Sequence, residues 1–426
     1  MSSKSNSLLL GSVVAAIACI GSATLAAEVP AGTVISAENY QQIKDQTWQG
    51  TRIGDLITPA FEMWITKYGL KMPLGRTTDV KLDPLYLKAT ADNMGKAKLD
   101  AQHHITGYVA GIPFPNLDLN DPDCGWKAAW NEYLADPMIG DSWFADAQVA
   151  IIDGHSGIID RFGAASAKMV TEGRTIGAAK IDEPNEHAKY LLVLTSPYDI
   201  AGLGVFNVQY NDGKPDDAWV YIRNLRRVRR TSGAGSWMDP QPKMDLLNDD
   251  NQGLLGYPLW FKNFKCTGKR KVLAVLNGAD ANKPHKLEDL IDTAHAPYWN
   301  PINTVWEPRD VIVVEATPPD EHPYGKKVLY QDVKFPKFYH SEIYDHKGEF
   351  WRLWRQSYSM AINGNGAPGI ALVDTQAIDF QRERATNIDM TLTKTNLLGP
   401  EWFTEGTLEK AASGALFTEL NKYREH

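Results

Sequence analysis

Short segments in which apolar and polar residues alternate dominate the chain between residues 95 and 355, and this pattern predicts β-strands. The segments are separated by turn sequences such as Asp153-Gly154 and Asn211-Asp212-Gly213, because aspartate, asparagine and glycine tolerate positive φ. Consecutive hairpins indicate an antiparallel meander, and a sheet this long has to curl or close to protect its edges. The predicted strands cover residues 147–153, 158–162, 190–195, 205–210, 219–230, 271–276, 311–317, 327–332 and 338–344.

Three amphipathic helices are predicted before residue 140. The first begins at Thr58 and Pro59, which are typical of a helix start, and ends at Gly69. Its apolar side includes Phe61 and Trp64.

The second predicted helix covers residues 84–94, and the third carries Trp126 and Trp130, which lie on one face because they are four residues apart. Such helices ahead of a curled sheet suit a lid over a concave surface, but an ordinary structural layer would have the same sequence pattern. We therefore expect an α+β fold, mostly β: a large curled antiparallel sheet, an incomplete barrel, covered by amphipathic helices. In the second helix the residues expected to point inward are Leu85, Leu87 and Ala91.

The segment 219–230 combines an aromatic, β-branched start with an arginine-rich end. As one continuous strand it places Trp219, Tyr221, Arg227 and Arg229 on one face, and each face is apolar at its start and cationic at its end. One interpretation is an edge strand whose charges prevent edge-to-edge pairing. The other is the wall of an apolar cavity, with a cationic rim for an anionic headgroup or partner. The rim also includes Arg226 and Arg230.

Residues 1–27 have the layout of a cleaved secretory signal peptide, which predicts export to the periplasm. Lys4 precedes an apolar run over residues 8–20, and alanines at 23, 26 and 27 offer a cleavage site. The run is too short for a stable membrane span, so we expect a soluble mature protein. Lipid anchoring at Cys19 is not expected, because alanine replaces the leucine-like residue of a lipobox. We expect the rest of the chain to form one domain over residues 28–396 and a helical tail over residues 397–426.

Removal of the predicted signal peptide takes away Lys4 and changes the formal net charge from −8 to −9. An acidic exported protein has little reason to bind nucleic acid, despite its arginine-rich strand. Two cysteines remain, Cys124 and Cys266, and an oxidising periplasm permits a disulfide between them; two free buried thiols are the alternative.

Familiar catalytic, metal-binding and cofactor-binding motifs are missing from the sequence. The segment 154–157 reads Gly-His-Ser-Gly, so its second glycine comes one position too early for the Gly-x-Ser-x-Gly motif of a nucleophile elbow. The adjacent His103 and His104 would face opposite sides of a strand and could not readily bind one metal ion. We therefore expect no catalytic residue, no metal and no cofactor. Glu315 is conspicuous in the apolar strand 311–317, because a buried carboxylate needs a partner. An arginine of 226–230 is one candidate partner, and a bound ligand is another.

Several motifs resemble those of domain-of-unknown-function family 1329 and occur in the same order along the chain. Members of that family resemble proteins with the LolA/LolB lipoprotein-carrier fold. The resemblance covers residues 40–380. It rests on Trp219, Tyr221, Ile222, Arg226, Val228, Arg229, Arg230, Ser232 and Gly233; Gly107 to Pro115; Asp121-Pro122, Trp126 and Trp130-Asn131; Trp306-Glu307, Arg309 and Val313 to Thr317; His322, Tyr324 and Lys326 to Tyr330; and Tyr344-Asp345 with Gly348 and Trp351-Arg352.

The resemblance implies a periplasmic carrier for a lipid, a lipoprotein acyl chain or another hydrophobic or amphiphilic molecule. It also implies partners: an inner-membrane exporter of the RND/MMPL superfamily and an outer-membrane protein. An assembly protein without a ligand and a periplasmic hydrolase are the alternatives. The candidate ligand-binding residues are Phe61, Trp64, Tyr108, Trp126, Trp219, Tyr221, Arg226, Arg227, Arg229, Arg230 and Glu315.

Overall fold

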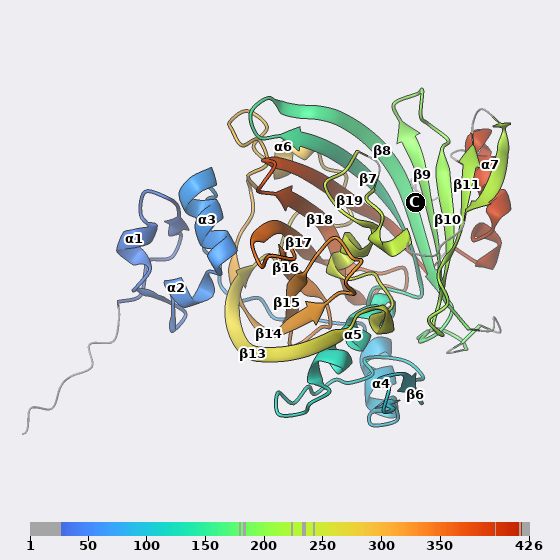
Figure 1. Ribbon diagram of the computed structural model, residues 1–426, viewed down its shortest axis with the longest axis horizontal. Helices are drawn as coiled ribbons and strands as arrows, with labels where there is room; N and C mark the ends of the chain where they lie inside the picture. Colours follow the sequence, from blue (N-terminus) through green and yellow to red (C-terminus); the bar gives the residue numbers. More distant parts are fainter. Residues whose placement is uncertain are drawn as a thin grey trace, which may run out of the picture.

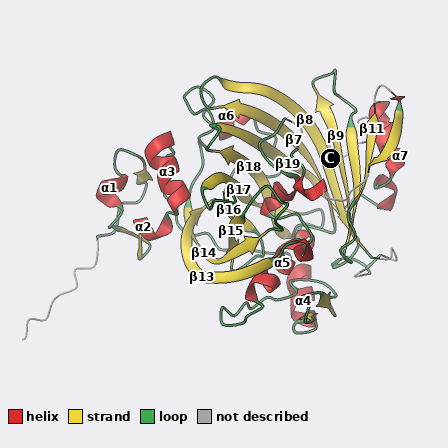
Figure 2. Ribbon diagram, in the orientation of Figure 1, coloured by secondary structure: helices red, strands yellow, loops and turns green. Residues whose placement is uncertain are grey.

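A single antiparallel sheet of 13 strands forms the body of the protein (Figures 1 and 2). The computed structural model describes residues 27–178, 180–181, 185–222, 225–231, 236–241, 243–396, 398–416 and 419. The predicted signal peptide, apart from its last residue, lies outside this part of the chain, as does Cys19.

The predicted strands all lie in the large sheet, but the segment 219–230 forms two strands, and the three strands after residue 349 were not predicted. The strands of the large sheet are β7 Ser142–Asp153, β8 Gly157–Val170, β9 Glu186–Ser196, β10 Gly204–Tyr210, β11 Asp217–Ile222, β12 Arg227–Thr231, β13 Asn263–Ala274, β14 Glu307–Thr317, β15 Lys326–Asp332, β16 Phe338–Tyr344, β17 Phe350–Ile362, β18 Pro368–Asp379 and β19 Arg384–Thr395. Smaller strands pair outside this sheet: β1 Val34–Ile35 with β4 Met72–Pro73, β2 Thr47–Trp48 with β3 Thr51–Arg52, and β5 Lys98–Leu99 with β6 Ile105–Thr106.

The large sheet consists of two meanders that meet in the middle. Its order is β12-β11-β10-β9-β8-β7-β19-β18-β17-β16-β15-β14-β13, so the last strand, β19, pairs with the first, β7. The sheet curls without closing, and β12 and β13 are its two edges (Figure 1). Beyond the end of β13, Val275 makes an isolated bridge to Ser357 of β17, which shows how tightly this side curls.

The segment between β12 and β13 crosses one face of the sheet, and we call its described residues 236–241 and 243–262 the strap. It contains η3 Ser236–Met238, η4 Asn248–Gly253 and η5 Pro258–Trp260, and η4 contacts β16 and β17. The buried carboxylates of Asp249 and Asp250 accept hydrogen bonds from the Lys327 Nζ of β15, at 2.8 and 3.2 Å. Burial alone would lower the pKa of Lys327, but these two carboxylates raise it above its ordinary value, so the amine stays charged.

The first predicted helix is present as α3 Pro59–Tyr68, which follows the short helices α1 Tyr40–Ile43 and α2 Ile53–Leu56. Gly69 ends α3 in the left-handed conformation, as a helix-terminating glycine should, but Thr58 makes no capping hydrogen bond with its side chain. Phe61 and Trp64 are buried in a cluster that includes Leu353 of β17. The helix therefore packs as a structural layer of the core.

The second helix, α4 Pro84–Asn93, exposes the side that was predicted to be buried. Tyr86 and Thr90 point into the protein, and the Thr90 Oγ1 accepts a hydrogen bond from the Ile112 N–H at 3.0 Å. The segment around Gly111 lies so close to Thr90 that a Cβ atom on that glycine would be 2.4 Å from the Thr90 nitrogen. This contact selects the buried face of α4, and the residues wrongly predicted to point inward are Leu85, Leu87 and Ala91.

The third helix, α5 Cys124–Tyr133, contacts β13 and β14. A disulfide between Cys124 and Cys266 joins α5 to the edge strand β13, with the two Cα atoms 5.7 Å apart. Gly125 lies against the backbone of Phe264, where a Cβ atom would come within 2.3 Å of the carbonyl carbon. The short element η1 Asp136–Met138 follows α5, and α6 Leu287–Leu290 lies between β13 and β14.

The described part of the C-terminal tail packs on the other side of the sheet from the strap residues. It contains η6 Pro400–Trp402 and α7 Glu405–Ala412, and α7 contacts β10, β11 and β12. Leu408 and Leu416 belong to one buried cluster with Leu191 and Val193 of β9. The tail is thus part of the core in this region, and its described residues are helical only in part.

Candidate functional site

The arginine-rich segment forms a hairpin, and its prediction as one strand over 219–230 is wrong. The chain reverses after Ile222, and β12 begins at Arg227. Arg226 adopts a left-handed conformation with φ of 49°, next to residues 223 and 224, which lie outside the described part of the chain. The arginines therefore lie opposite the apolar residues and not beyond them.

One face of this hairpin packs against the C-terminal tail. Trp219, Tyr221 and Val228 contact the cluster that contains the tail residues. Arg230 pairs with Asp217, and its guanidinium lies 5.6 Å from the ring centre of Trp219. Burial opposes ionisation of Asp217, but hydrogen bonds from Arg230, Tyr210 and Lys214 lower its pKa to about 2. Arg230, Trp219 and Tyr221 are therefore engaged in contacts within the protein.

The opposite face of the hairpin combines aliphatic residues with arginines, and we call it the hairpin face. Strand register places Leu192, Val205, Val220 and Arg229 in one row across β9 to β12. Ile222 and Arg227 form the neighbouring pair on this face. The four aliphatic side chains are half-buried, and none belongs to an apolar cluster formed by the described residues.

Arg227 and Arg229 are exposed and have no ion-pair partner among the described residues. Because they are two positions apart on one strand, their side chains start about 7 Å from each other. Guanidinium groups bind carboxylates and phosphates in a bidentate manner, and the aliphatic row offers a surface for a hydrocarbon chain. The hairpin face therefore has the chemistry to hold an amphiphile with an anionic end.

Both edges of the sheet are cationic, which supports the edge-strand interpretation as well. β12 carries three arginines, and β13 at the other edge exposes Lys265 and Lys269. Such charges prevent sheet edges from pairing between molecules. Edge protection explains why cations occur on β12, but it does not explain the half-exposed aliphatic row beside them.

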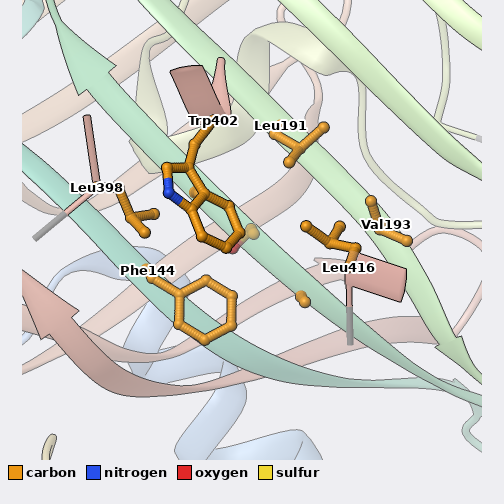
Figure 3. A pocket seen from close by; sticks show the side chains of 9 residues that line it. Phe144, Leu191, Val193, Leu398, Trp402 and Leu416 are labelled. Atoms are coloured by element: carbon orange, nitrogen blue, oxygen red, sulfur yellow. The ribbon is translucent and has the colours of Figure 1, made fainter. Parts of the chain in front are cut away.

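An apolar pocket lies on the tail side of the same strands (Figure 3). Trp402, Leu398 and Leu416 of the tail face Phe144 of β7 and Leu191 and Val193 of β9 across it. The free volume left in it is only about 10 Å³, far below the usual range of ligand pockets. The tail thus largely fills the space that a ligand would need on this side.

A second, open cleft of about 780 Å³ lies between β13 and the segment of α2 and α3, and charged residues form much of its lining. Two of its three cations, Arg270 and Lys271, are engaged within the protein, and Lys269 is exposed. Arg270 donates to the backbone carbonyl of Asp55 at 2.5 Å, and Lys271 pairs with Asp310 at 2.8 Å. The cleft therefore offers fewer cations without a partner than the hairpin face does.

The structure does not bring all the predicted site residues together. Phe61 and Trp64 are buried beside β17, while Trp126 stacks on His103 and packs against β13 at the far edge of the sheet. The Tyr108 hydroxyl donates to the carbonyl of Gly111 in the segment that covers α4. A role of these four aromatic residues in ligand binding stays a prediction, and their packing is that of core residues.

Glu315 was predicted to be buried and paired with an arginine of 226–230, and this is wrong. Its side chain is 38% exposed and pairs with Lys326 at 3.5 Å. β14 lies beside the edge that is opposite to the hairpin, so the arginines are out of reach. Strand alternation is the physical reason, because Val314 and Ala316 take the buried face and Glu315 faces outward.

Sequence reasoning missed Leu192 and Val205, which complete the aliphatic row. The signal was the segment 191–194, which is apolar at every position and so predicts a strand with two apolar faces.

In the described ranges, no group of three or more histidine, cysteine or acidic side chains is placed to hold a metal ion.

The buried imidazole of His340 was also missed, and it predicts a pH dependence of stability. His340 lies between Phe61 of α3 and Tyr330, with ring centres at 4.9 and 4.2 Å. Burial, with smaller contributions from Arg270 and Arg355, lowers its pKa to about 3 from an ordinary 6.5. Between these values the unfolded chain binds a proton that the folded protein does not, so stability falls as pH falls through this window.

Between pH 7 and pH 5 this single group should lower the free energy of unfolding by about 2 kcal/mol. Urea denaturation of a His340→Phe variant should show a pH-dependent loss that is smaller by this amount. His295→Phe, at an exposed position, serves as the control and should retain the wild-type pH dependence. An unchanged pH dependence in His340→Phe would contradict the assignment.

Among solved structures, a candidate outer membrane lipoprotein-sorting protein domain from Vibrio parahaemolyticus is similar to this chain, with a TM-score of 0.47 and 17% identity. That match covers 68% of this chain and all of the domain. A DUF1329 family protein from Desulfovibrio piger gives a TM-score of 0.46 and 18% identity, with the same coverage of 68% and 100%. A LolA superfamily protein from Nitrosomonas europaea gives 0.39 and 14%, covering 64% of this chain and 95% of its own.

Within the described residues, no helix combines the length and apolarity needed to span a membrane. No protein of curated function matches the sequence. The family model described as "Protein of unknown function (DUF1329)" matches residues 34–408, which is most of the sequence and includes the hairpin, the strap and the first turn of α7. The chain therefore belongs to the DUF1329 family of proteins of unknown function.

Proposed function

We propose that this protein is a periplasmic carrier that binds a hydrophobic molecule with an anionic end on the hairpin face. The observation that carries the proposal is the row of half-buried aliphatic residues beside two unpaired arginines. A molecule that crosses an aqueous compartment between membranes needs its hydrocarbon part covered, and this face offers such a cover together with a site for the charged end.

The expected affinity suits a carrier. Covering about 200 Å² of hydrocarbon contributes about 5 kcal/mol at roughly 25 cal/mol per Å². The entropic cost of association offsets part of this gain, and contacts of the headgroup with the arginines add to it. Binding of moderate strength allows the cargo to be released at its destination.

The cellular setting of the proposal comes from the sequence. The signal-peptide pattern of residues 1–27 supports a periplasmic location, and the family resemblance supports an inner-membrane exporter of the RND/MMPL superfamily and an outer-membrane protein as partners. In this proposal the exporter delivers the cargo to the hairpin face, and the outer-membrane protein receives it.

Binding of an anionic naphthalene sulfonate probe, measured by fluorescence and by competition with a long-chain fatty acid, tests the site. Val220→Asn with Ile222→Asn should weaken probe binding about tenfold, because polar groups replace part of the aliphatic row. Arg227→Gln with Arg229→Gln should weaken it by a similar factor at low salt and much less at high salt. Lys265→Gln, at the other exposed edge strand, is the matched charge control and should bind like the wild type.

Folding of each variant is checked by its melting temperature, which should change little because these side chains are partly or fully exposed. Equal probe binding by all folded variants would disprove the site. A wild-type protein that binds no amphiphile but captures envelope proteins would favour the assembly function, for which the exposed edge β12 is the natural contact.

A further inference from the structure

The outward side of α4 carries a continuous apolar stripe. Pro84, Leu87, Ala91 and Met94 are spaced by three or four residues and so lie on one face, and all four are exposed. Leu87 is 48% exposed and Met94 is 56% exposed. The helix lies at the periphery of the molecule (Figure 1), and its inner side packs on the large sheet through Tyr86, in one cluster with Val272 of β13 and Val311 of β14.

The stripe is held in this position by the packing of the opposite helix face. Tyr86 is completely buried, and Thr90 is tied to Tyr86 and Ile112 by hydrogen bonds. The Asn93 side chain donates to the carbonyl of Ala110 at 3.4 Å, beside the exposed Val109. A rotation of α4 that buried the stripe would break these contacts, so the apolar surface is a fixed feature of the fold.

Lysines without carboxylate partners flank the stripe. Lys81 precedes α4, and Lys96 and Lys98 follow it; within the described ranges none of the three forms an ion pair. The nearby carboxylates, in contrast, are all engaged. Asp79 pairs with Lys334 at 3.0 Å, Asp92 pairs with Lys88, Asp83 accepts from the Leu85 N–H, and Asp100 accepts from the His104 N–H.

We propose that the α4 stripe docks the protein on the surface of a bilayer that contains anionic lipids. Aliphatic residues on one helix face with flanking lysines are the features of a helix that lies in the membrane interface, where lysine stems reach the headgroups. The hot spots of protein interfaces are instead enriched in tyrosine, tryptophan and arginine, and the stripe has none of these three. Lysine is depleted at protein interfaces, whereas lysines flank this stripe. This docking surface does not depend on the ligand site at the hairpin face.

Flotation of the folded protein with vesicles tests the proposal. The protein should float with vesicles that contain phosphatidylglycerol, and less with pure phosphatidylcholine. Lys96→Gln with Lys98→Gln should reduce partitioning about 25-fold, which is fivefold for each lysine near the surface. Leu87→Ser with Met94→Ser should reduce it at least about tenfold. Ile159→Ser with Ile362→Ser removes two exposed apolar residues elsewhere and should float like the wild type.

Three results would overturn the proposal: a wild-type protein that floats with neither vesicle, a stripe variant that floats normally, or a control variant that loses as much as the stripe variant. Failure with both vesicles would assign α4 to a protein partner instead. If the serine variant fails to fold, the glutamine variant still decides the question, because its side chains are exposed. Probe binding at the hairpin face, measured on the same samples, should remain unchanged in the stripe variants.

Discussion

Replacement of Lys327 by methionine should lower the free energy of unfolding by about 3–5 kcal/mol, the typical cost of breaking a buried ion pair. The Lys327 ammonium is completely buried and is the cation between Asp249 and Asp250 of the strap. Without it, two carboxylates remain in a site from which water is excluded. The strap should therefore lose its main attachment to β15.

The neighbouring Lys326→Met variant is the matched control. Lys326 is 39% exposed and pairs with the partly exposed Glu315, so its loss should cost no more than about 1 kcal/mol. Equilibrium denaturation in urea, monitored by tryptophan fluorescence, measures both changes. Equal effects of the two substitutions would show that the strap is not held by this buried pair.

Removal of the disulfide should cost about 2–5 kcal/mol. Cys124 and Cys266 are 142 residues apart in sequence, so the bond closes a long loop and restricts the unfolded chain strongly. In the folded protein it also fastens α5 to the free edge of the sheet, where Gly125 allows the close approach. Cys124→Ser with Cys266→Ser should therefore shift the urea transition to lower concentrations.

Reduction of the wild-type protein with dithiothreitol should reproduce this shift, and the same reagent should have no effect on the double serine variant. Mass spectrometry after alkylation checks that the bond is formed before reduction and absent afterwards. A wild-type transition that stays at the same urea concentration after complete reduction would contradict a stabilising role for the bond.

Local chemistry explains which elements were predictable. Asp153-Gly154 and Asn211-Asp212-Gly213 were expected to reverse the chain, and hairpins do occur there. The α3 helix begins at the expected Pro59 and ends before Gly69, because proline and glycine act on the backbone of their own turn. Such signals require no knowledge of distant residues.

The hairpin at 222–227 was missed because it lacks such a local signal. Its turn has no glycine, and the arginines on either side continue a period-two pattern, so nothing local marks the reversal except Asn224. The reversal changes the candidate site, because it places Arg229 opposite Val220 and separates this face from Trp219. The site residues Leu192 and Val205 then join it from β9 and β10.

The sequence by itself determined the mostly β character, the meanders, the helix α3 and the family, because turn residues, alternation and ordered motifs are local properties. Only the tertiary structure decided the pairing of β19 with β7, the outward face of α4 and the true partners of Glu315 and Lys327. These features depend on contacts between residues far apart in the chain. When both faces of a helix or a strand carry apolar residues, the sequence pattern alone does not decide which face is buried. The hairpin face arises in the same way, since β9, β10, β11 and β12 each contribute only one or two of its side chains.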